Sequence, residues 1–220
     1  MAMIAYPPIF RVRQRFDAPR VDDVEGLVLA ELTRLELQRV VLPGARVAVP
    51  VGSRGIARID RIIKTIVDYF KSIGAEPFII PAMGSHGGGT AEGQLEVIRS
   101  YGINETTMGC PILASMETVV VCETREGIPV HFDRHAFEAD HVLVCNRIKP
   151  HTHFVGPLES GLMKMMLIGL GKRAGAEIYH RAIQQYSFLQ IIRSVADEVR
   201  RRCKILAGLA IVENAYDQTA

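Results

Sequence analysis

Three short polar segments of this chain carry side chains that can bind anions or move protons. They are residues 53–55 (SRG), residues 84–90 (GSHGGGT) and residues 149–153 (KPHTH). An arginine can hold a carboxylate through two parallel hydrogen bonds, and a histidine exchanges protons near neutral pH. Each segment follows an apolar, strand-like run. We therefore expect the three to meet beyond the carboxyl ends of a parallel sheet.

Each of these segments also has a purely structural interpretation. Arg54 can be a solvated side chain in a turn, and GSHGGGT can be a flexible connection that exposes the imidazole of His86. His151 and His153 are two positions apart, so in an extended loop they point to opposite sides and only one faces a given site. A zinc site built on them needs a third ligand nearby.

Lys164 is a charged residue inside the apolar run LMKMMLIGL. Burial would lower the pKa of its amine and make it a nucleophile that can form a covalent link. Alternatively, its alkyl stem packs on the helix while the ammonium reaches water. His180 follows sixteen residues later and indicates no function by itself.

The elements that position these residues alternate between strands and helices. Residues 45–51, 77–81 and 141–146 are apolar runs typical of buried strands, and residues 59–73 carry an apolar stripe with helical spacing. Residues 90–101 are predicted as a second helix, with Thr90 as its N-cap. This order predicts an α/β fold with a largely parallel sheet flanked by helices.

The second half of the chain continues the pattern. We expect a hairpin from residues 118–123 and 128–132, then helices near 159–167, 174–185 and 188–203, then a strand in ILAGLAIV. No helical segment follows that strand. We therefore expect residues 1–220 to form one α/β domain, the N-terminal half of a two-domain protein whose C-terminal domain is absent or cut off after about residue 215.

Composition narrows the class of protein. The 220 residues are 48% hydrophobic and 23% charged, with a net charge of +2, which excludes disordered, collagen-like and disulfide-scaffold proteins. The densest basic cluster is Arg200, Arg201, Arg202 and Lys204, too short to predict nucleic-acid binding. No signal peptide or membrane span is predicted. The four dispersed cysteines predict reduced thiols in a cytoplasmic protein.

The ordered set of motifs resembles the N-terminal half of the nickel-pincer-nucleotide-dependent lactate racemase family over about residues 45–215. The resemblance rests on Arg54, His86 in GSH, the stretch PHTHF, Lys164 in ESGLMK, and His180. It implies a racemase or epimerase of a small 2-hydroxyacid, working by proton-coupled hydride transfer. It also implies that Lys164 carries the nickel pincer nucleotide covalently, with Ser160 and Gly161 contacting the cofactor.

The resemblance assigns roles to the remaining residues. His180 would bind nickel, and Arg54 would hold the substrate carboxylate. His86 and a second histidine would act as acid and base on opposite faces of the substrate. The Pro-His pairing favours His151 as the second histidine, whereas the count back from Lys164 favours His153. Racemisation at a hydroxyl-bearing carbon needs a hydride acceptor, which the cofactor would supply, and a proton acceptor, which the histidines would supply.

Two positions depart from the family. The acidic residue three positions before the arginine is Val51 here, and the second glycine of the SGG stretch is Leu162. A non-lactate substrate is therefore expected. The expected partners are the second domain, cofactor-biosynthesis proteins and, through the face left exposed, another copy of the chain. The isolated domain is expected to be inactive, and without those biosynthesis proteins it would lack the cofactor.

Two other functions remain open from the sequence. A zinc-type metallohydrolase would use His86, His151 or His153 as ligands. A non-enzymatic phosphate- or nucleotide-binding module would use the backbone of GSHGGGT.

Overall fold

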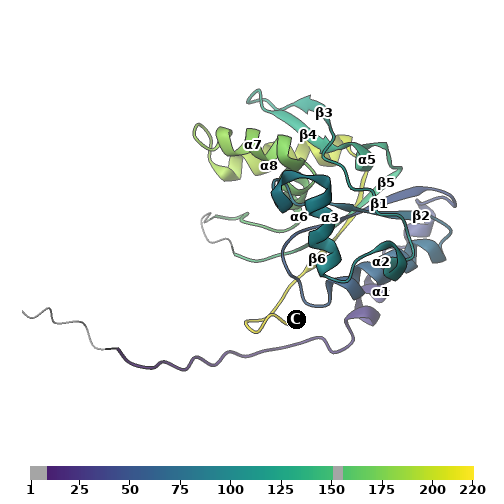
Figure 1. Cartoon of the computed structure of the whole chain (residues 1–220), viewed down its shortest axis with the longest axis vertical. Helices are drawn as coiled ribbons and strands as arrows, with labels where there is room; N and C mark the ends of the chain where they lie inside the picture. Colours follow the sequence, from purple (N-terminus) through teal and green to yellow (C-terminus); the bar gives the residue numbers. More distant parts are fainter. Residues whose placement is uncertain (1–8, 151–155) are drawn as a thin grey trace, which may run out of the picture.

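A four-stranded parallel sheet organises the chain (Figure 1), in a computed structural model that describes residues 9–150 and 156–220. Its strand order is β2-β1-β5-β6, and each neighbouring pair is parallel. An antiparallel hairpin, β3-β4, forms a separate two-stranded sheet. The strands are β1 (Arg46–Val51), β2 (Glu76–Pro81), β3 (Thr118–Glu123), β4 (Pro129–Asp133), β5 (His141–Arg147) and β6 (Ile205–Ile211).

Helices cover both faces of the four-stranded sheet. The α-helices are α1 (Val24–Arg34), α2 (Ile59–Ser72), α3 (Ala91–Ser100), α4 (Glu105–Met108), α5 (Arg134–Glu138), α6 (Leu162–Lys164), α7 (Lys172–Ala182) and α8 (Phe188–Arg202). Three further turns are the 3-10 turns η1 (Leu37–Arg39) and η2 (Gly87–Gly89) and the π-helical turn η3 (Met165–Gly169). The α/β class predicted from the sequence is confirmed.

Strand β1 shows how the apolar runs build two cores. Successive side chains of a strand point to opposite faces. Val47, Val49 and Val51 pack in the cluster that contains α1 and α2, whereas Ala48 belongs to the cluster that contains α8 and η3. A parallel sheet covered on both faces needs such continuously apolar strands. The predicted parallel pairing of the first two strands is confirmed, with Val51 opposite Pro81.

Helix α2 buries the apolar stripe predicted for residues 59–73. Ile62, Ile63, Ile66 and Phe70 are fully buried, and the helix ends at Ser72. Thr90 is the N-cap of α3, as predicted, and its hydroxyl accepts a hydrogen bond from the Gly93 N–H.

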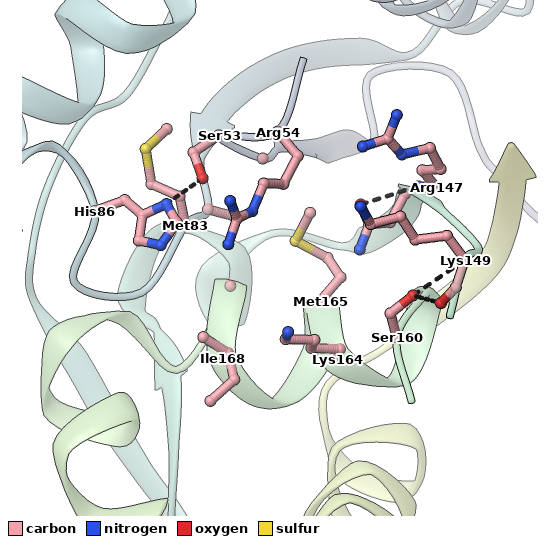
Figure 2. Close-up of a pocket in the computed structure, with 14 residues that line it drawn as sticks. Ser53, Arg54, Met83, His86, Arg147, Lys149, Ser160, Lys164, Met165 and Ile168 are labelled. Atoms are coloured by element: carbon pink, nitrogen blue, oxygen red, sulfur yellow. Dashed lines mark hydrogen bonds between the residues drawn. The ribbon is translucent and has the colours of Figure 1, made fainter. Parts of the chain in front are cut away.

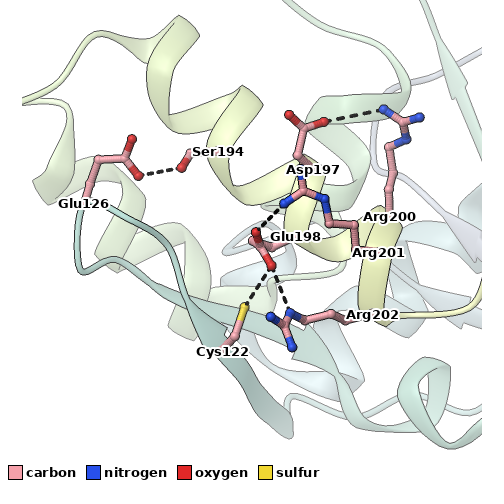
Figure 3. A network of polar contacts seen from close by, with 8 residues as sticks. All are labelled: Cys122, Glu126, Ser194, Asp197, Glu198, Arg200, Arg201 and Arg202. Atoms are coloured by element: carbon pink, nitrogen blue, oxygen red, sulfur yellow. Dashed lines mark hydrogen bonds and ion pairs between the residues drawn. The ribbon is translucent and has the colours of Figure 1, made fainter.

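The hairpin β3-β4 packs against α8, as Figure 3 shows. The Cys122 thiol donates to Glu198, and the Ser194 hydroxyl donates to Glu126 at 2.5 Å. Glu198 also pairs with Arg201 and Arg202. The arginines that formed the densest basic cluster in the sequence are therefore engaged with α8's own carboxylates.

The segment around Lys164 differs from the prediction. A helix was expected near residues 159–167, but α6 begins at Leu162 and passes directly into the π turn η3. All four cysteines are free thiols, with Cys110, Cys145 and Cys203 buried. Within the part of the chain that the structure describes, no helix is long and apolar enough to cross a membrane.

Candidate functional site

A cavity of about 200 Å³ opens at the carboxyl ends of β1, β2 and β5, where parallel sheets place ligands. It collects residues from four separate segments (Figure 2). Its lining comprises Gly52, Ser53, Arg54, Ala82, Met83, His86, Asn146, Arg147, Lys149, Ser160, Lys164, Met165, Ile168 and Gly169. The three segments expected to converge do so through Arg54, His86 and Lys149.

His86 lies beside two cations and one hydroxyl. Its Nδ1 is 2.5 Å from Ser53 Oγ, in the loop that follows the neighbouring strand β1. Partial burial lowers the pKa of the imidazole, and the charges of Arg54 and Lys164 lower it further. The neutral imidazole, which can accept a proton, is therefore favoured near neutral pH.

Two residues that sequence reasoning missed hold the loops around His86. The fully buried Gln94 amide of α3 donates to the carbonyls of Gly84 (2.8 Å) and His86 (3.2 Å). The Tyr101 hydroxyl donates to the Ser53 carbonyl at 2.5 Å. Gln94 lies one helical turn before the buried Ile98, so the two residues share the buried face of α3. A polar residue on that face is the sequence feature that could have indicated a role for Gln94.

Lys164 is half-buried at the end of α6 and lines the cavity. Burial lowers the pKa of its amine, and the positive charges of Arg54 and Lys149 act in the same direction. Of the two interpretations that the sequence left open, this half-buried position fits a partly desolvated amine better than an ammonium that lies fully in water.

The end of β5 adds two further cations. Arg147 is neutralised by an ion pair with Glu213, whose carboxylate also accepts the Ala57 N–H at 2.6 Å. Lys149 is exposed at the cavity rim, and sequence reasoning did not assign it a role. The Ser160 hydroxyl accepts from the Lys149 N–H at 3.1 Å and donates to the Lys149 carbonyl at 2.5 Å, which joins the two ends of segment 149–160.

The other residues assigned from the resemblance lie elsewhere. Gly161 is buried and does not line the cavity, and its carbonyl accepts from the Asn146 amide at 3.0 Å. His180 is exposed on α7 and borders an adjacent hollow of about 430 Å³ together with Ser85, the residue before His86. His151 and His153 fall outside the described residues.

Within 9–150 and 156–220, no three His, Cys, Asp or Glu side chains lie together so as to hold a metal ion. Of the histidines that the structure describes, His86 lines the cavity and His180 borders the adjacent hollow.

The cavity as a whole suits an anionic ligand. Arg54, Lys149 and Lys164 add positive charge to its lining, and Ser53 and Asn146 add short polar groups. Carboxylates and phosphates are the groups that such a set binds best. Arg54 can orient the anion, His86 can take a proton, and Lys164 can form a covalent bond.

Comparison with known proteins identifies the family to which the chain belongs. Among curated proteins, none matches the chain significantly. The family described as lactate racemase N-terminal domain matches residues 20–189, a span that includes every sequence-assigned site residue. The match covers most of the chain, including β1, β2 and β5, at whose carboxyl ends the cavity opens. The chain therefore belongs to the lactate racemase N-terminal domain family.

Proposed function

We propose that this chain is the cofactor-carrying domain of a 2-hydroxyacid racemase or epimerase. The supporting observation is that Arg54, His86 and Lys164, which are 110 residues apart in sequence from first to last, line one cationic cavity. These are the groups needed to hold a carboxylate, accept a hydroxyl proton and tether a cofactor. Family membership supports an isomerase of this kind.

In this proposal each residue of the site has its own role in the reaction. Arg54 binds the substrate carboxylate through a bidentate pair and so fixes the hydroxyl-bearing carbon near His86. The neutral imidazole of His86 accepts the hydroxyl proton as the hydrogen on carbon leaves with its electron pair, giving the 2-keto acid. Return of that hydride to the opposite face, with a proton from a second acid, yields the other enantiomer. His151 or His153 is our proposal for that acid.

The charged and nucleophilic groups of the cavity are of the kinds that the cofactor implied by the family resemblance, a nickel pincer nucleotide, would need. When bound, this group supplies the acceptor for the hydride. Lys164 would hold it through its amine, which burial and neighbouring cations make nucleophilic. Lys149 would offer positive charge to its phosphate, and Ser160 borders the same cavity. His180, in the adjacent hollow, is the proposed nickel ligand.

The substrate side of the site is proposed to be shared with a second α/β domain. Val51 and Leu162 replace residues expected in lactate racemases, so a 2-hydroxyacid other than lactate is the proposed substrate. We expect the 220-residue chain by itself to show little or no turnover.

The test is the intact mass of the chain produced together with pincer-cofactor biosynthesis enzymes and nickel, followed by peptide mapping. A nucleotide-sized adduct on Lys164 is expected in the wild type and not in Lys164→Ala. The matched control is Lys64→Ala, an exposed lysine of α2 that pairs with Asp68, and it should retain the adduct.

An unmodified Lys164 would contradict the proposal, provided that the same biosynthesis enzymes load a known lactate racemase. Retention of zinc by such a protein would instead favour a metallohydrolase. Phosphate binding that survives substitution of His86, His151 and His153 would favour a non-enzymatic binding module.

A further inference from the structure

We propose that Ser53 is a positioning residue that holds His86 in the tautomer whose Nε2 accepts the substrate's hydroxyl proton. This inference rests on the proposed function for the identity of the proton donor. Its structural basis is the 2.5 Å contact between Ser53 Oγ and His86 Nδ1. Figure 2 shows that the other nitrogen of the ring points away from Ser53.

The direction of this hydrogen bond follows from the proton cycle. A histidine that accepts a proton at Nε2 must carry its own proton on Nδ1 beforehand. Nδ1 is then a donor, and Ser53 Oγ accepts from it. After the transfer, both ring nitrogens of the imidazolium are donors, so Ser53 Oγ still accepts. A hydrogen bond that Ser53 Oγ accepts from Nδ1 is therefore compatible with both protonation states of His86. A hydrogen bond that Ser53 donates to Nδ1 requires a neutral ring with its proton on Nε2, and such a ring has no free Nε2 lone pair to accept the substrate's proton.

Hydrogen bonds to the backbone also hold both residues of this contact in place. The Ser53 carbonyl accepts from the Tyr101 hydroxyl, and the His86 carbonyl accepts from the Gln94 amide. Both donors come from the helix α3 and the residue that directly follows it. The two loops are therefore tied to one rigid element, which fixes the distance between hydroxyl and imidazole before substrate binds.

The sequence context explains why a serine can reach this nitrogen. Ser53 lies two residues after β1, and His86 lies five residues after β2, the strand paired with β1 in parallel. Val51 and Pro81 end their strands opposite each other. The loops therefore start side by side at the same edge of the sheet, and the longer glycine-containing loop folds His86 back toward Ser53.

The test is nitrogen NMR of the chain labelled with ¹⁵N-histidine, which reports the tautomer and the titration of His86. Wild type should show the Nδ1–H form. Ser53→Ala should move His86 toward the Nε2–H form that free histidine prefers, and Ser53→Thr, which keeps the hydroxyl, should restore the Nδ1–H form. Ser100→Ala, an exposed serine whose hydroxyl bonds the Val97 carbonyl, should leave His86 unchanged.

Turnover provides a second readout in the cofactor-loaded enzyme with its substrate domain. Ser53→Ala should lower kcat about tenfold, the equivalent of one net hydrogen bond, with KM little changed. Ser53→Thr should recover most of that loss. A His86 tautomer that is the same in wild type and Ser53→Ala would overturn the inference.

The two proposals can fail separately. If Lys164 receives no adduct but Ser53→Ala changes the tautomer, the racemase proposal falls while the role of Ser53 on His86 stands. If the adduct forms and Ser53→Ala leaves the His86 tautomer unchanged, only the inference about Ser53 is overturned.

Discussion

The ammonium of Lys172 lies 2.8 Å from the carboxylate of Asp133, and both side chains are completely buried. Lys172 also donates to the Pro81 carbonyl at 2.5 Å, where β2 ends and the segment carrying His86 begins. Asp133 in turn accepts the Ala136 N–H at the start of α5. One buried ion pair therefore joins the hairpin, the central sheet and the helix that follows η3.

Replacing Lys172 by Met should destabilise the fold by about 3–5 kcal/mol, because it leaves the Asp133 carboxylate buried without its partner. Urea denaturation measures this change. Lys64→Met, which removes an exposed pair, is the control and should cost less than about 1 kcal/mol. The double variant Lys172→Met with Asp133→Leu should recover part of the loss. Equal losses of stability in Lys172→Met and Lys64→Met would show that the buried Lys172–Asp133 pair stabilises the fold no more than an exposed pair does.

Within the glycine-rich loop, Gly87 and Gly88 both have positive φ, at 62° and 68°. An added Cβ at Gly87 would lie 2.6 Å from the Gly93 carbonyl carbon, whereas at Gly88 it would meet nothing within 4 Å. Gly88→Ala should therefore cost only the left-handed strain, about 1–2 kcal/mol. Gly87→Ala should cost clearly more, as measured by thermal denaturation. An equal cost at the two positions would mean that the contact with α3 is readily relieved.

The Gln94 amide should control the order of the loop that carries His86. Gln94→Leu removes two donors and leaves the Gly84 and His86 carbonyls without them, at a cost of about 1–3 kcal/mol. Amide hydrogen exchange in residues 84–90 should accelerate as the loop opens. Glu92→Gln, an exposed change on the same helix, is the control. Unchanged exchange in Gln94→Leu would show that the glycines hold the loop unaided.

The amine of Lys164 should react as a neutral nucleophile at lower pH than an ordinary lysine. Its pKa is lowered from 10.5 by burial, Arg54 and Lys149, so the deprotonated fraction grows at a lower pH. The midpoint of its acetylation rate against pH should therefore lie below 10.5. Arg54→Gln removes one positive neighbour and should shift this midpoint upward. Peptide mass spectrometry measures the rate, with Lys64 in the same sample as a check on reagent activity.

If Lys164 keeps the same midpoint in Arg54→Gln, the two side chains do not share one electrostatic environment. The same substitution should also raise the pKa of His86, because Arg54 lowers it in the wild type. Concordant shifts at Lys164 and His86 would show that Arg54 acts on both groups.

The sequence predicted the strands and the residues on the loops that follow them, but not the residues that hold those loops. Apolar runs such as residues 45–51 identify buried strands because burial on both faces leaves no polar alternation. Arg54, His86 and Lys164 each also had an ordinary structural interpretation, and they could be selected only as an ordered set that resembles the lactate racemase family. Gln94 and Lys172 could not be paired with their partners, since a buried polar group finds its partner through the tertiary fold.

The π turn escaped prediction for a related reason. Residues 165–169 are as apolar as an ordinary buried helix, and side-chain periodicity over five residues cannot separate a π turn from an α turn. The sequence therefore indicated a helix around Lys164 while its start was predicted three residues early.

The π turn η3 also determines which mutations can change the direction of the Lys164 side chain. A π turn holds more residues than an α turn, and each residue of an α-helix advances the chain by about 100°. Deleting one residue from 165–169 would rotate α6 relative to α7 by roughly that angle and carry Lys164 away from Arg54. Exchanging those residues for other apolar ones would not. The direction in which the Lys164 amine points therefore depends on the number of residues in segment 165–169. Insertions and deletions in this segment change that direction, whereas apolar substitutions do not.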